Sequence, residues 1–250
     1  GIFAYGESGS SGIVGISNLV RNSGVVASDT SGVGTSRHSL CATEYGSDTA
    51  IFALGFIGSS PYYLGLSNLV NNSGVIASDT SAVATGRYLP SGVKYSTDKG
   101  ILLQGIAAST DGYNTNKVSN SGVVASDVGG VGTARYGSGA CEYGSGKGIV
   151  AYGHTGQVQS AISNLVSDSG VVAADVTGVG TARHRMGAAN YGTYEKIMPF
   201  TMPTGEVIPD DSAEVIAARR TLAINATHPA SWQWNEAAVS YVPPSNPPDK

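Results

Sequence analysis

The chain has 250 residues, a formal net charge of −4 and only 13% charged residues. That length can hold a substantial core and a smaller appended region. There is no basic stripe to follow a phosphate backbone and no apolar run near the roughly 18 residues of a membrane span, so neither nucleic acid nor a membrane is an expected partner. The two cysteines, Cys41 and Cys141, are too few for a disulfide scaffold or a zinc site, and we expect buried or half-buried thiols.

A seven-residue segment recurs four times along the chain. Ser23–Asp29, which reads Ser-Gly-Val-Val-Ala-Ser-Asp, returns almost unchanged at Ser73–Asp79, Ser121–Asp127 and Ser169–Asp175. The final aspartates are 50, 48 and 48 residues apart. A fixed period in this range is typical of solenoids and propellers, whose repeats stack on copies of themselves.

Each repeat begins with two apolar segments separated by a loop. The first segments are short runs that predict strands covered on both faces: Ile2–Gly6, Ile51–Gly55, Ile101–Gly105 and Ile149–Gly153. The second strands are expected at Ile13–Val20, Tyr62–Val70, Tyr113–Val118 and Gln159–Val166, of which the third is the most polar. A Ser-Gly turn follows, where glycine supplies a positive φ, and a short return strand such as Val75–Ala77 completes a hairpin.

The last strand of each repeat begins at a Thr-x-Arg triplet and is rich in Ala, Ser and Gly. These strands are predicted to start at Thr35, Thr85, Thr133 and Thr181 and to end at Tyr45, Tyr95, Tyr143 and Tyr191. Small side chains suit a strand crowded against its equivalents around an axis. The total is about four strands per repeat, which is the content of one propeller blade.

One stretch resembles the kelch pattern. It contains Thr133–Gly137 (Thr-Ala-Arg-Tyr-Gly), a Lys147-Gly148 turn and Ile149–Gly153 (Ile-Val-Ala-Tyr-Gly). The match covers about residues 1–196, although single glycines stand where kelch repeats have a pair and the usual tryptophan is absent. The resemblance implies an all-β, four-bladed kelch-like β-propeller with about 48–50 residues per blade and the small-residue strand innermost.

The two ends of residues 1–196 complement each other. The chain starts with the second strand of a blade, and Thr181–Tyr191 is a surplus innermost strand. We expect this strand to fill the vacancy beside Ile2–Gly6 and close the ring, which would remove exposed sheet edges. A fragment cut from a larger ring is the alternative.

Residues 197–250 form a separate C-terminal extension by composition. Prolines mark a linker, Asp211–Glu214 has the spacing of a capping box, and a helix is predicted over 215–224. Ser231–Glu236 and Val239–Val242 predict a small hairpin. The expected assembly contacts of this extension are Trp232, Trp234 and Tyr241.

The segment Pro229–Ala237 (Pro-Ala-Ser-Trp-Gln-Trp-Asn-Glu-Ala) resembles segments near the ends of virion structural proteins of tailed bacteriophages, and the repeats resemble kelch-like repeats in such proteins. The resemblance implies a non-enzymatic structural protein located in the virion, in a tail, a fibre or a capsid or neck decoration. It further implies many copies, no cofactor, and docking of residues 197–250 on other virion proteins. The alternatives are a carbohydrate-binding, receptor-binding propeller module whose partner is a host surface glycan, and an enzyme built on a propeller.

Two polar residues recur in every repeat. They are the aspartates Asp29, Asp79, Asp127 and Asp175, and the arginines Arg37, Arg87, Arg135 and Arg183. We expect each aspartate to bond its own turn backbone, with a cation-binding channel as the alternative. We expect each arginine to tie one blade to the next through carbonyls or these aspartates, with an anion-binding ring as the alternative.

Four rim residues directly follow the arginines: His38, Tyr88, Tyr136 and His184. Tyrosine combines apolar area with a hydroxyl, so these positions are the candidate glycan contacts. No catalytic or metal-binding residue is predicted, because the sequence lacks a serine-nucleophile motif and a phosphate loop. Cys141-Glu142-Tyr143 does not supply the Cys–Tyr–His set of copper-radical enzymes built on kelch propellers.

Overall fold

The computed structural model describes residues 1–9, 12–107 and 114–190, together with the backbone of four short strands between residues 200 and 242. The chain divides into two compact units, Gly1–Tyr191 and Gly192–Lys250. All regular elements in these described parts are β-strands, which confirms the all-β class. Across the same residues, no helix has the length and apolarity needed to cross a membrane.

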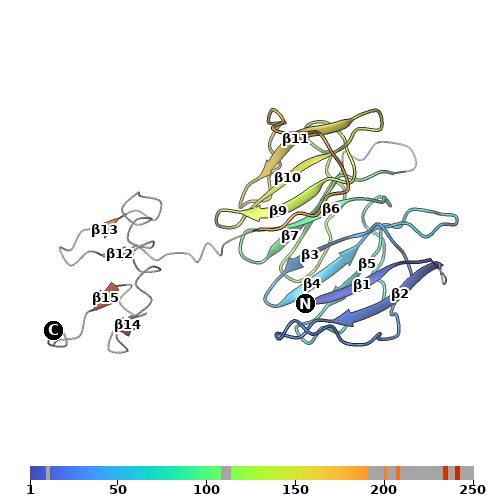
Figure 1. Cartoon of the computed structure of the whole chain (residues 1–250), viewed down its shortest axis with the longest axis horizontal. Coiled ribbons are helices and arrows are strands. Elements are labelled where there is room, and N and C mark those ends of the chain that lie inside the picture. The colour runs from blue at the N-terminus through green and yellow to red at the C-terminus, as the bar shows by residue number, and fades with distance from the viewer. Residues whose placement is uncertain are drawn as a thin grey trace. The chain divides into compact units, whose positions relative to one another are not determined.

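The described part of the first unit contains four antiparallel sheets, one for each repeat (Figure 1). The first is β1 (Ile2–Ser8) and β2 (Gly12–Leu19), and the second is β3 (Cys41–Tyr45), β4 (Thr49–Ala53) and β5 (Ser67–Val70). The third is β6 (Ser91–Tyr95), β7 (Lys99–Leu103) and β8 (Thr115–Val118), and the fourth is β9 (Gly139–Tyr143), β10 (Lys147–His154) and β11 (Gln159–Val166). The apolar runs predicted as strands form β1 and the middle strands β4, β7 and β10.

The three complete sheets share one register. Their first and middle strands pair Cys41 with Ala53, Ser91 with Leu103, and Gly139 with Ala151. The first sheet has no such first strand, since β1 pairs with β2 alone. Among the described residues, no strand therefore pairs with the other edge of β1.

The predicted return strands are reduced to isolated bridges. After the Ser-Gly turn, one residue pairs back on the preceding strand, as Val70 does with Ile76. Further along, the Thr80 N–H donates to the Ser67 carbonyl, and between these two places the Asn68 side chain donates from Nδ2 to the Ala77 carbonyl at 3.0 Å in place of a continuous ladder. Each complete sheet accordingly has three strands, and the expectation of about four was wrong.

The sheets stack on one another in chain order, with β6 against β3 and β9 against β6. The outer turns touch as well, because Gly74 packs on Leu19 and Gly122 packs on Leu69. Neighbouring sheets therefore contact each other both at their first strands and at these outer turns. Figure 1 shows the β1–β2 sheet at one end of the stack and the β9–β11 sheet at the other. Ring closure is not seen in this arrangement, and the propeller stays a prediction.

The core lies between the sheets and is formed mainly by their middle strands. Ile51, Ile101 and Leu102 are fully buried, and Cys41 is buried among them. Burial raises the pKa of the Cys41 thiol to about 12, so this thiol stays protonated. Cys141 is half-buried, and neither cysteine forms a disulfide, as expected.

The second unit contains two short hairpins among its described residues. β12 (Phe200–Thr201) pairs with β13 (Val207–Ile208), and β14 (Gln233–Asn235) pairs with β15 (Ser240–Val242). The second hairpin is the predicted one, and it places Trp234 opposite Tyr241. Trp232 and the helix predicted over 215–224 lie outside the described residues.

Candidate functional site

The repeated polar residues meet inside each complete sheet. In the second sheet, Arg37 donates from Nε to the Leu54 carbonyl at 2.8 Å and from Nη2 to Asn68 Oδ1 at 2.7 Å. Asn68 donates from Nδ2 to Asp79 Oδ1 at 2.9 Å. The other Asp79 oxygen accepts from the Thr35 hydroxyl at 2.7 Å and from its backbone N–H at 3.0 Å. We call this set the Thr-Arg-Asn-Asp network.

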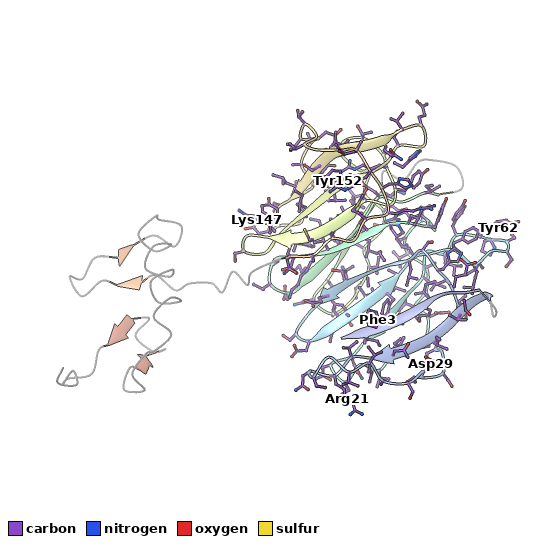
Figure 2. The ribbon with its side chains drawn as sticks, viewed as in Figure 1. Phe3, Arg21, Asp29, Tyr62, Lys147 and Tyr152 are labelled. Carbon is purple, nitrogen blue, oxygen red and sulfur yellow. The ribbon has the colours of Figure 1, made fainter. Side chains whose placement is uncertain are left out.

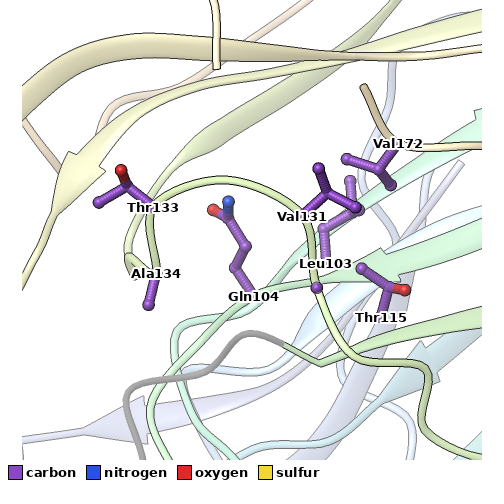
Figure 3. A pocket seen from close by; sticks show the side chains of 8 residues that line it. Leu103, Gln104, Thr115, Val131, Thr133, Ala134 and Val172 are labelled. Atoms are coloured by element: carbon purple, nitrogen blue, oxygen red, sulfur yellow. The ribbon is translucent and has the colours of Figure 1, made fainter. Parts of the chain in front are cut away.

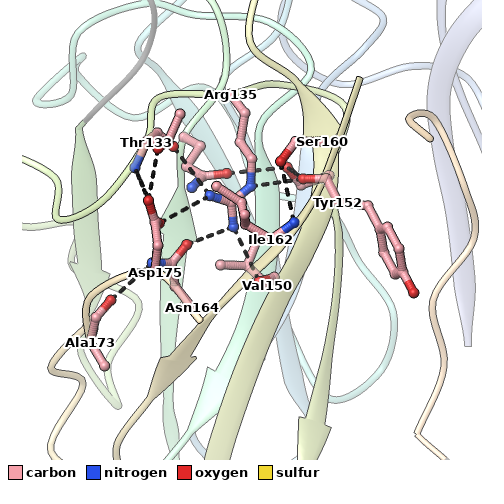
Figure 4. Close-up of polar contacts among 11 residues, drawn as sticks. Thr133, Arg135, Val150, Tyr152, Ser160, Ile162, Asn164, Ala173 and Asp175 are labelled. Carbon is pink, nitrogen blue, oxygen red and sulfur yellow. Dashed lines mark hydrogen bonds and ion pairs between the residues drawn. The ribbon is translucent and has the colours of Figure 1, made fainter. Parts of the chain in front are cut away.

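The same network recurs in the third and fourth sheets. Its members there are Thr85, Arg87, Asn116 and Asp127, and then Thr133, Arg135, Asn164 and Asp175 (Figure 4). The arginine–asparagine bonds are 2.6 Å long in both copies. All three network arginines have an exposed fraction of 0%. A fully buried guanidinium is tolerated only when its N–H groups are bonded, which the network ensures.

The electrostatics of each network favour a charged pair. Burial lowers the pKa of the three arginines, but arginine remains protonated in proteins. For Asp79, Asp127 and Asp175, burial acts first and opposes ionisation. Hydrogen bonds from threonine and asparagine, joined by the nearby arginine charge, outweigh it and lower the pKa of each carboxyl group.

These bonds differ from the predicted ones in their partners. Asp79 was expected to bond its own turn, yet its partner Thr35 lies 44 residues earlier in the chain. The arginine side chains bond carbonyls and approach aspartates, but within their own sheet and not across to the next. The asparagines were missed, although Asn18, Asn68, Asn116 and Asn164 repeat with the same period as the aspartates and could have been found that way.

The alternative roles of these residues fit the geometry poorly. An anion-binding ring needs accessible guanidinium groups, and Arg37, Arg87 and Arg135 are completely buried. A cation-binding channel needs the repeated aspartates close together. Within residues 1–9, 12–107 and 114–190, no cluster of three His, Cys, Asp or Glu side chains could hold a metal ion.

The repeated arginines do link neighbouring sheets, through their backbone carbonyls. Each carbonyl accepts a hydrogen bond from a glycine of the preceding sheet, with N···O distances of 2.8–3.2 Å, in the pairs Gly6–Arg37, Gly55–Arg87, Gly105–Arg135 and Gly153–Arg183. These glycines have φ between 109° and 128°, a region that favours glycine. A Cβ atom at Gly55 would also lie 3.0 Å from the His38 carbonyl oxygen.

The first sheet holds one half of a network. Asn18 donates from Nδ2 to Asp29 Oδ1 at 2.8 Å and to the Ala27 carbonyl at 3.1 Å, as its equivalents do. No arginine or threonine from the described residues bonds to this pair. We call Asn18 and Asp29 the acceptor half.

The segment after the fourth sheet holds the other half. Arg183 donates from Nη1 to the Thr181 carbonyl at 3.0 Å, as the other repeated arginines do to their own threonines. Its guanidinium lies 3.8 Å from the centre of the Tyr152 ring, and the residue is exposed. We call Thr181 and Arg183 the donor half. Figure 2 marks Asp29 in the loop that follows β2, at one end of the stack, and Tyr152 in β10, in the sheet at the other end.

Apolar side chains are exposed at both ends of the stack. Phe3 in β1 is 63% exposed, whereas its equivalent Phe52 is 7% exposed. At the other end Tyr143 is 38% exposed, whereas the equivalent tyrosines Tyr45 and Tyr95 are 6% and 4% exposed. Phe52 is covered by Tyr5 of the sheet before it, and no described sheet precedes Phe3. Tyr45 and Tyr95 are covered by the turn glycines of the sheet after them, and no described sheet follows Tyr143.

The predicted rim residues form two short rows of rings. Phe56 lies 5.2 Å from His38 and 5.8 Å from Tyr88, measured between ring centres. His154 lies 5.2 Å from Tyr136 and 5.3 Å from His184. All six rings are half-buried, and Tyr62, which stacks on Phe56, is 49% exposed at the edge of the molecule (Figure 2). We call these seven residues the aromatic ladder.

A small cavity lies beside the network of the fourth sheet (Figure 3). Leu103, Gln104 and Thr115 line one side of it, and Val131 and Thr133 line another. Its volume of about 10 Å³ leaves room for roughly one water molecule. The cavity is therefore too small to be a substrate site.

No protein-family model matches the chain, and no curated protein matches it at a significant level.

Proposed function

We propose that this protein is a non-enzymatic structural component of a phage particle, as part of a tail, a fibre or a capsid or neck decoration. It is present in many copies in the virion. The stacked sheets form a rigid body, and the second unit docks on neighbouring virion proteins. The partners are other virion structural proteins, and no cofactor takes part.

One observation carries this proposal. The repeated polar side chains of the three complete sheets are consumed in internal bonds, while the first sheet and the segment after the fourth sheet present matching, unfilled halves of the same network. A protein built in this way does its work by burying surface against other subunits. The virion assignment itself rests on the sequence resemblance of the repeats and of Pro229–Ala237 to phage proteins.

The finer fold prediction, a closed four-bladed propeller of kelch type, belongs to the same proposal as an alternative use of the ends. Closure requires Thr181–Asn190 to reach β1 of its own chain. The matching network halves support such a pairing. Contact between the outer turns of neighbouring sheets, Gly74 on Leu19 and Gly122 on Leu69, supports an extended stack instead.

A carbohydrate-binding function is the second candidate, and the aromatic ladder favours it. Aromatic faces with hydroxyl groups at their edges suit sugar rings. Tyr62, Tyr88 and Tyr136 are the residues we would expect to make such contacts. Neighbouring rings also stabilise each other by about 0.5–1.5 kcal/mol a pair, so the ladder has a structural value even without a ligand.

The test is deletion of residues 201–250 from the protein in assembling particles. The structural proposal predicts that the truncated protein is missing from purified particles and that the intact protein shows no affinity for glycans. Incorporation of the truncated protein at the normal level would contradict docking through the second unit. Glycan binding that is lost in a Tyr62→Ala variant would favour the second candidate.

A further inference from the structure

We propose that copies of this protein join head to tail, with Thr181–Asn190 of one copy supplying the missing first strand to the β1–β2 sheet of the next copy. This inference deepens the proposed structural function, because it names a second copy of the chain as a partner of the first unit. It rests on three correspondences between the ends and the internal sheets.

The first correspondence is the polar network. The acceptor half, Asn18 and Asp29, has the same internal bonds as Asn68 and Asp79. The donor half has the Thr-x-Arg sequence and the same arginine-to-threonine bond as the internal copies. Joining the halves completes a fourth Thr-Arg-Asn-Asp network and buries Arg183, which is exposed in the single chain.

The second correspondence is strand register. Cys41, Ser91 and Gly139 are each four residues after a repeated arginine, and Gly187 holds that place after Arg183. The three internal residues pair with Ala53, Leu103 and Ala151, whose equivalent in β1 is Ala4. Gly187 is therefore expected opposite Ala4, and Ala188 opposite Phe3. Addition of a strand to an open sheet edge gives backbone hydrogen bonds along the whole segment.

The third correspondence is the stacking of whole sheets. Inside the chain, the turn glycine of each sheet packs on the sheet before it: Gly122 on Tyr45 and Leu69, and Gly170 on Tyr95 and Lys117. By the same step, Gly24 of a second copy would cover Tyr143 and Leu165, which are 38% and 36% exposed. Phe3, which is 63% exposed, would be covered by the fourth sheet of the first copy, as Phe52 is covered by Tyr5 of the sheet before it.

A second copy fits these correspondences better than the same chain does. The acceptor and donor halves lie at opposite ends of the stack, with three complete sheets between them (Figure 1). A second copy continues the stack by the step already used three times, whereas closure would bend every sheet contact. An interface of this head-to-tail kind repeats from copy to copy, giving a row or a ring of subunits.

The experiment uses full-length protein with either half disabled. Asn18→Ala with Asp29→Ala removes the acceptor half, and Arg183→Ala removes the donor half. Asp168→Ala is the matched control, since Asp168 is an exposed acidic residue outside the networks. Circular dichroism and thermal unfolding check that each variant folds. Sedimentation velocity over a concentration series then measures association.

We expect the wild type and the Asp168→Ala variant to associate as the protein concentration rises. In each half-disabled variant, the dissociation constant for self-association should increase about a hundredfold or more. An equimolar mixture of the two half-disabled variants retains one intact interface per pair, so it should form a dimer that grows no further. Any of three results overturns the inference: a wild type that stays monomeric, variants that associate like the wild type, or a mixture that forms no dimer. A further outcome separates this inference from the proposed function. If association is lost on deleting residues 201–250 but is unaffected in both half-disabled variants, the structural function is supported and the interface proposed here is refuted.

Discussion

At the scale of single residues, stability depends on charges that only the complete network can bury. Arg87 has no exposed surface, and its guanidinium bonds the Gln104 carbonyl at 2.7 Å and Asn116 at 2.6 Å. Its nearest charge is Asp127, with N and O atoms 3.7 Å apart. Removal of the arginine leaves the Gln104 carbonyl and the Asn116 amide oxygen without their buried donor and takes away the positive charge beside Asp127.

The Arg87→Met variant should therefore lose about 3–5 kcal/mol of unfolding free energy, the usual result of breaking a buried pair. Arg183→Met is the matched control, because it alters an exposed arginine whose stacking on Tyr152 contributes about 0.5–1 kcal/mol. Urea unfolding at low protein concentration measures both. Equal losses in the two variants would contradict the role assigned to the buried network.

The network aspartates make stability depend on pH in the acid range. The pKa of Asp127 is lower in the folded chain than in the unfolded chain, so its contribution is fully present above the unfolded value of about 3.9. It is lost as the pH falls through the lowered folded value. Unfolding free energy measured from about pH 6 to about pH 2 should fall less steeply for Asp127→Asn than for the wild type. Parallel curves would show that Asp127 is not held in its ionised form.

The two cysteines should differ in reactivity. Cys41 is buried with a pKa of about 12, so it has neither access to reagent nor thiolate character. We expect mass spectrometry after brief treatment with a thiol-alkylating reagent to find the folded protein modified at Cys141 only. Both cysteines should react in denaturant. Rapid modification of Cys41 in the folded chain would contradict the packing of β3 against its neighbours.

At the scale of elements, the spacing between sheets depends on small residues at their contact faces. Gly92 in β6 faces β3, and a Cβ atom there would lie 2.5 Å from the Ala42 carbonyl oxygen. The contact is with backbone, which has little freedom to move away. The small-residue strands predicted from the sequence thus have a physical explanation in the close approach of consecutive sheets.

Gly92→Ala should destabilise the protein by about 1–3 kcal/mol, the usual effect of overpacking. Gly129→Ala is the matched control, since a Cβ atom at Gly129 would meet nothing within 4 Å. Thermal unfolding of both variants makes the comparison. A Gly92→Ala protein as stable as the control would indicate that β3 and β6 lie further apart than described.

The sequence predicted some elements well because their signals are local. Apolar runs such as Ile51–Gly55 and Ile101–Gly105 are short, periodic and bounded by glycine, and they are the middle strands of the sheets. The prediction of a return strand over Val75–Ala77 was wrong. The Ala77 carbonyl bonds the side chain of Asn68 in the preceding strand, so the backbone pairing is reduced to an isolated bridge at Ile76. Residues that meet across about 40 positions, such as Thr35 and Asp79, leave no local sign of their pairing.

The sequence predicted most residues of the Thr-Arg-Asn-Asp network but not the hydrogen bonds between them. Repetition singled out Arg37 and Asp79, and the structure places both in one network. Their bonding within one sheet could not be predicted from the spacing alone. Arginines and aspartates that recur once per repeat have the same spacing whether they pair within a repeat or between neighbouring repeats. The incomplete first repeat and the surplus strand were visible in the sequence, but we expected Thr181–Tyr191 to fill the vacancy in its own chain. The exposure of Arg183 and Phe3 was therefore not predicted.

At the scale of the whole first unit, the described residues form a stack of equivalent sheets that is incomplete at each end. The interior sheets bury Phe52 or Leu102 and Tyr45 or Tyr95, whereas Phe3 in the first sheet, Tyr143 in the fourth sheet and Arg183 after it are exposed. Unpaired sheet edges of this kind favour association with further strands, and proteins usually block them. Here the open edge is that of β1, and the segment Thr181–Asn190 of another copy has the sequence and register to pair with it. The two ends of the stack would then join one copy to the next.

Backbone amide hydrogen exchange of β1, followed by mass spectrometry at several protein concentrations, tests this central claim most directly. The account predicts that β1 amides exchange faster than those of its equivalent β4 when the protein is dilute, and become protected as copies associate. The amides of β4 should be protected at every concentration, because that strand is already paired on both edges. Full protection of β1 in dilute, monomeric protein would contradict the account, since the missing strand would then come from the same chain and close the ring.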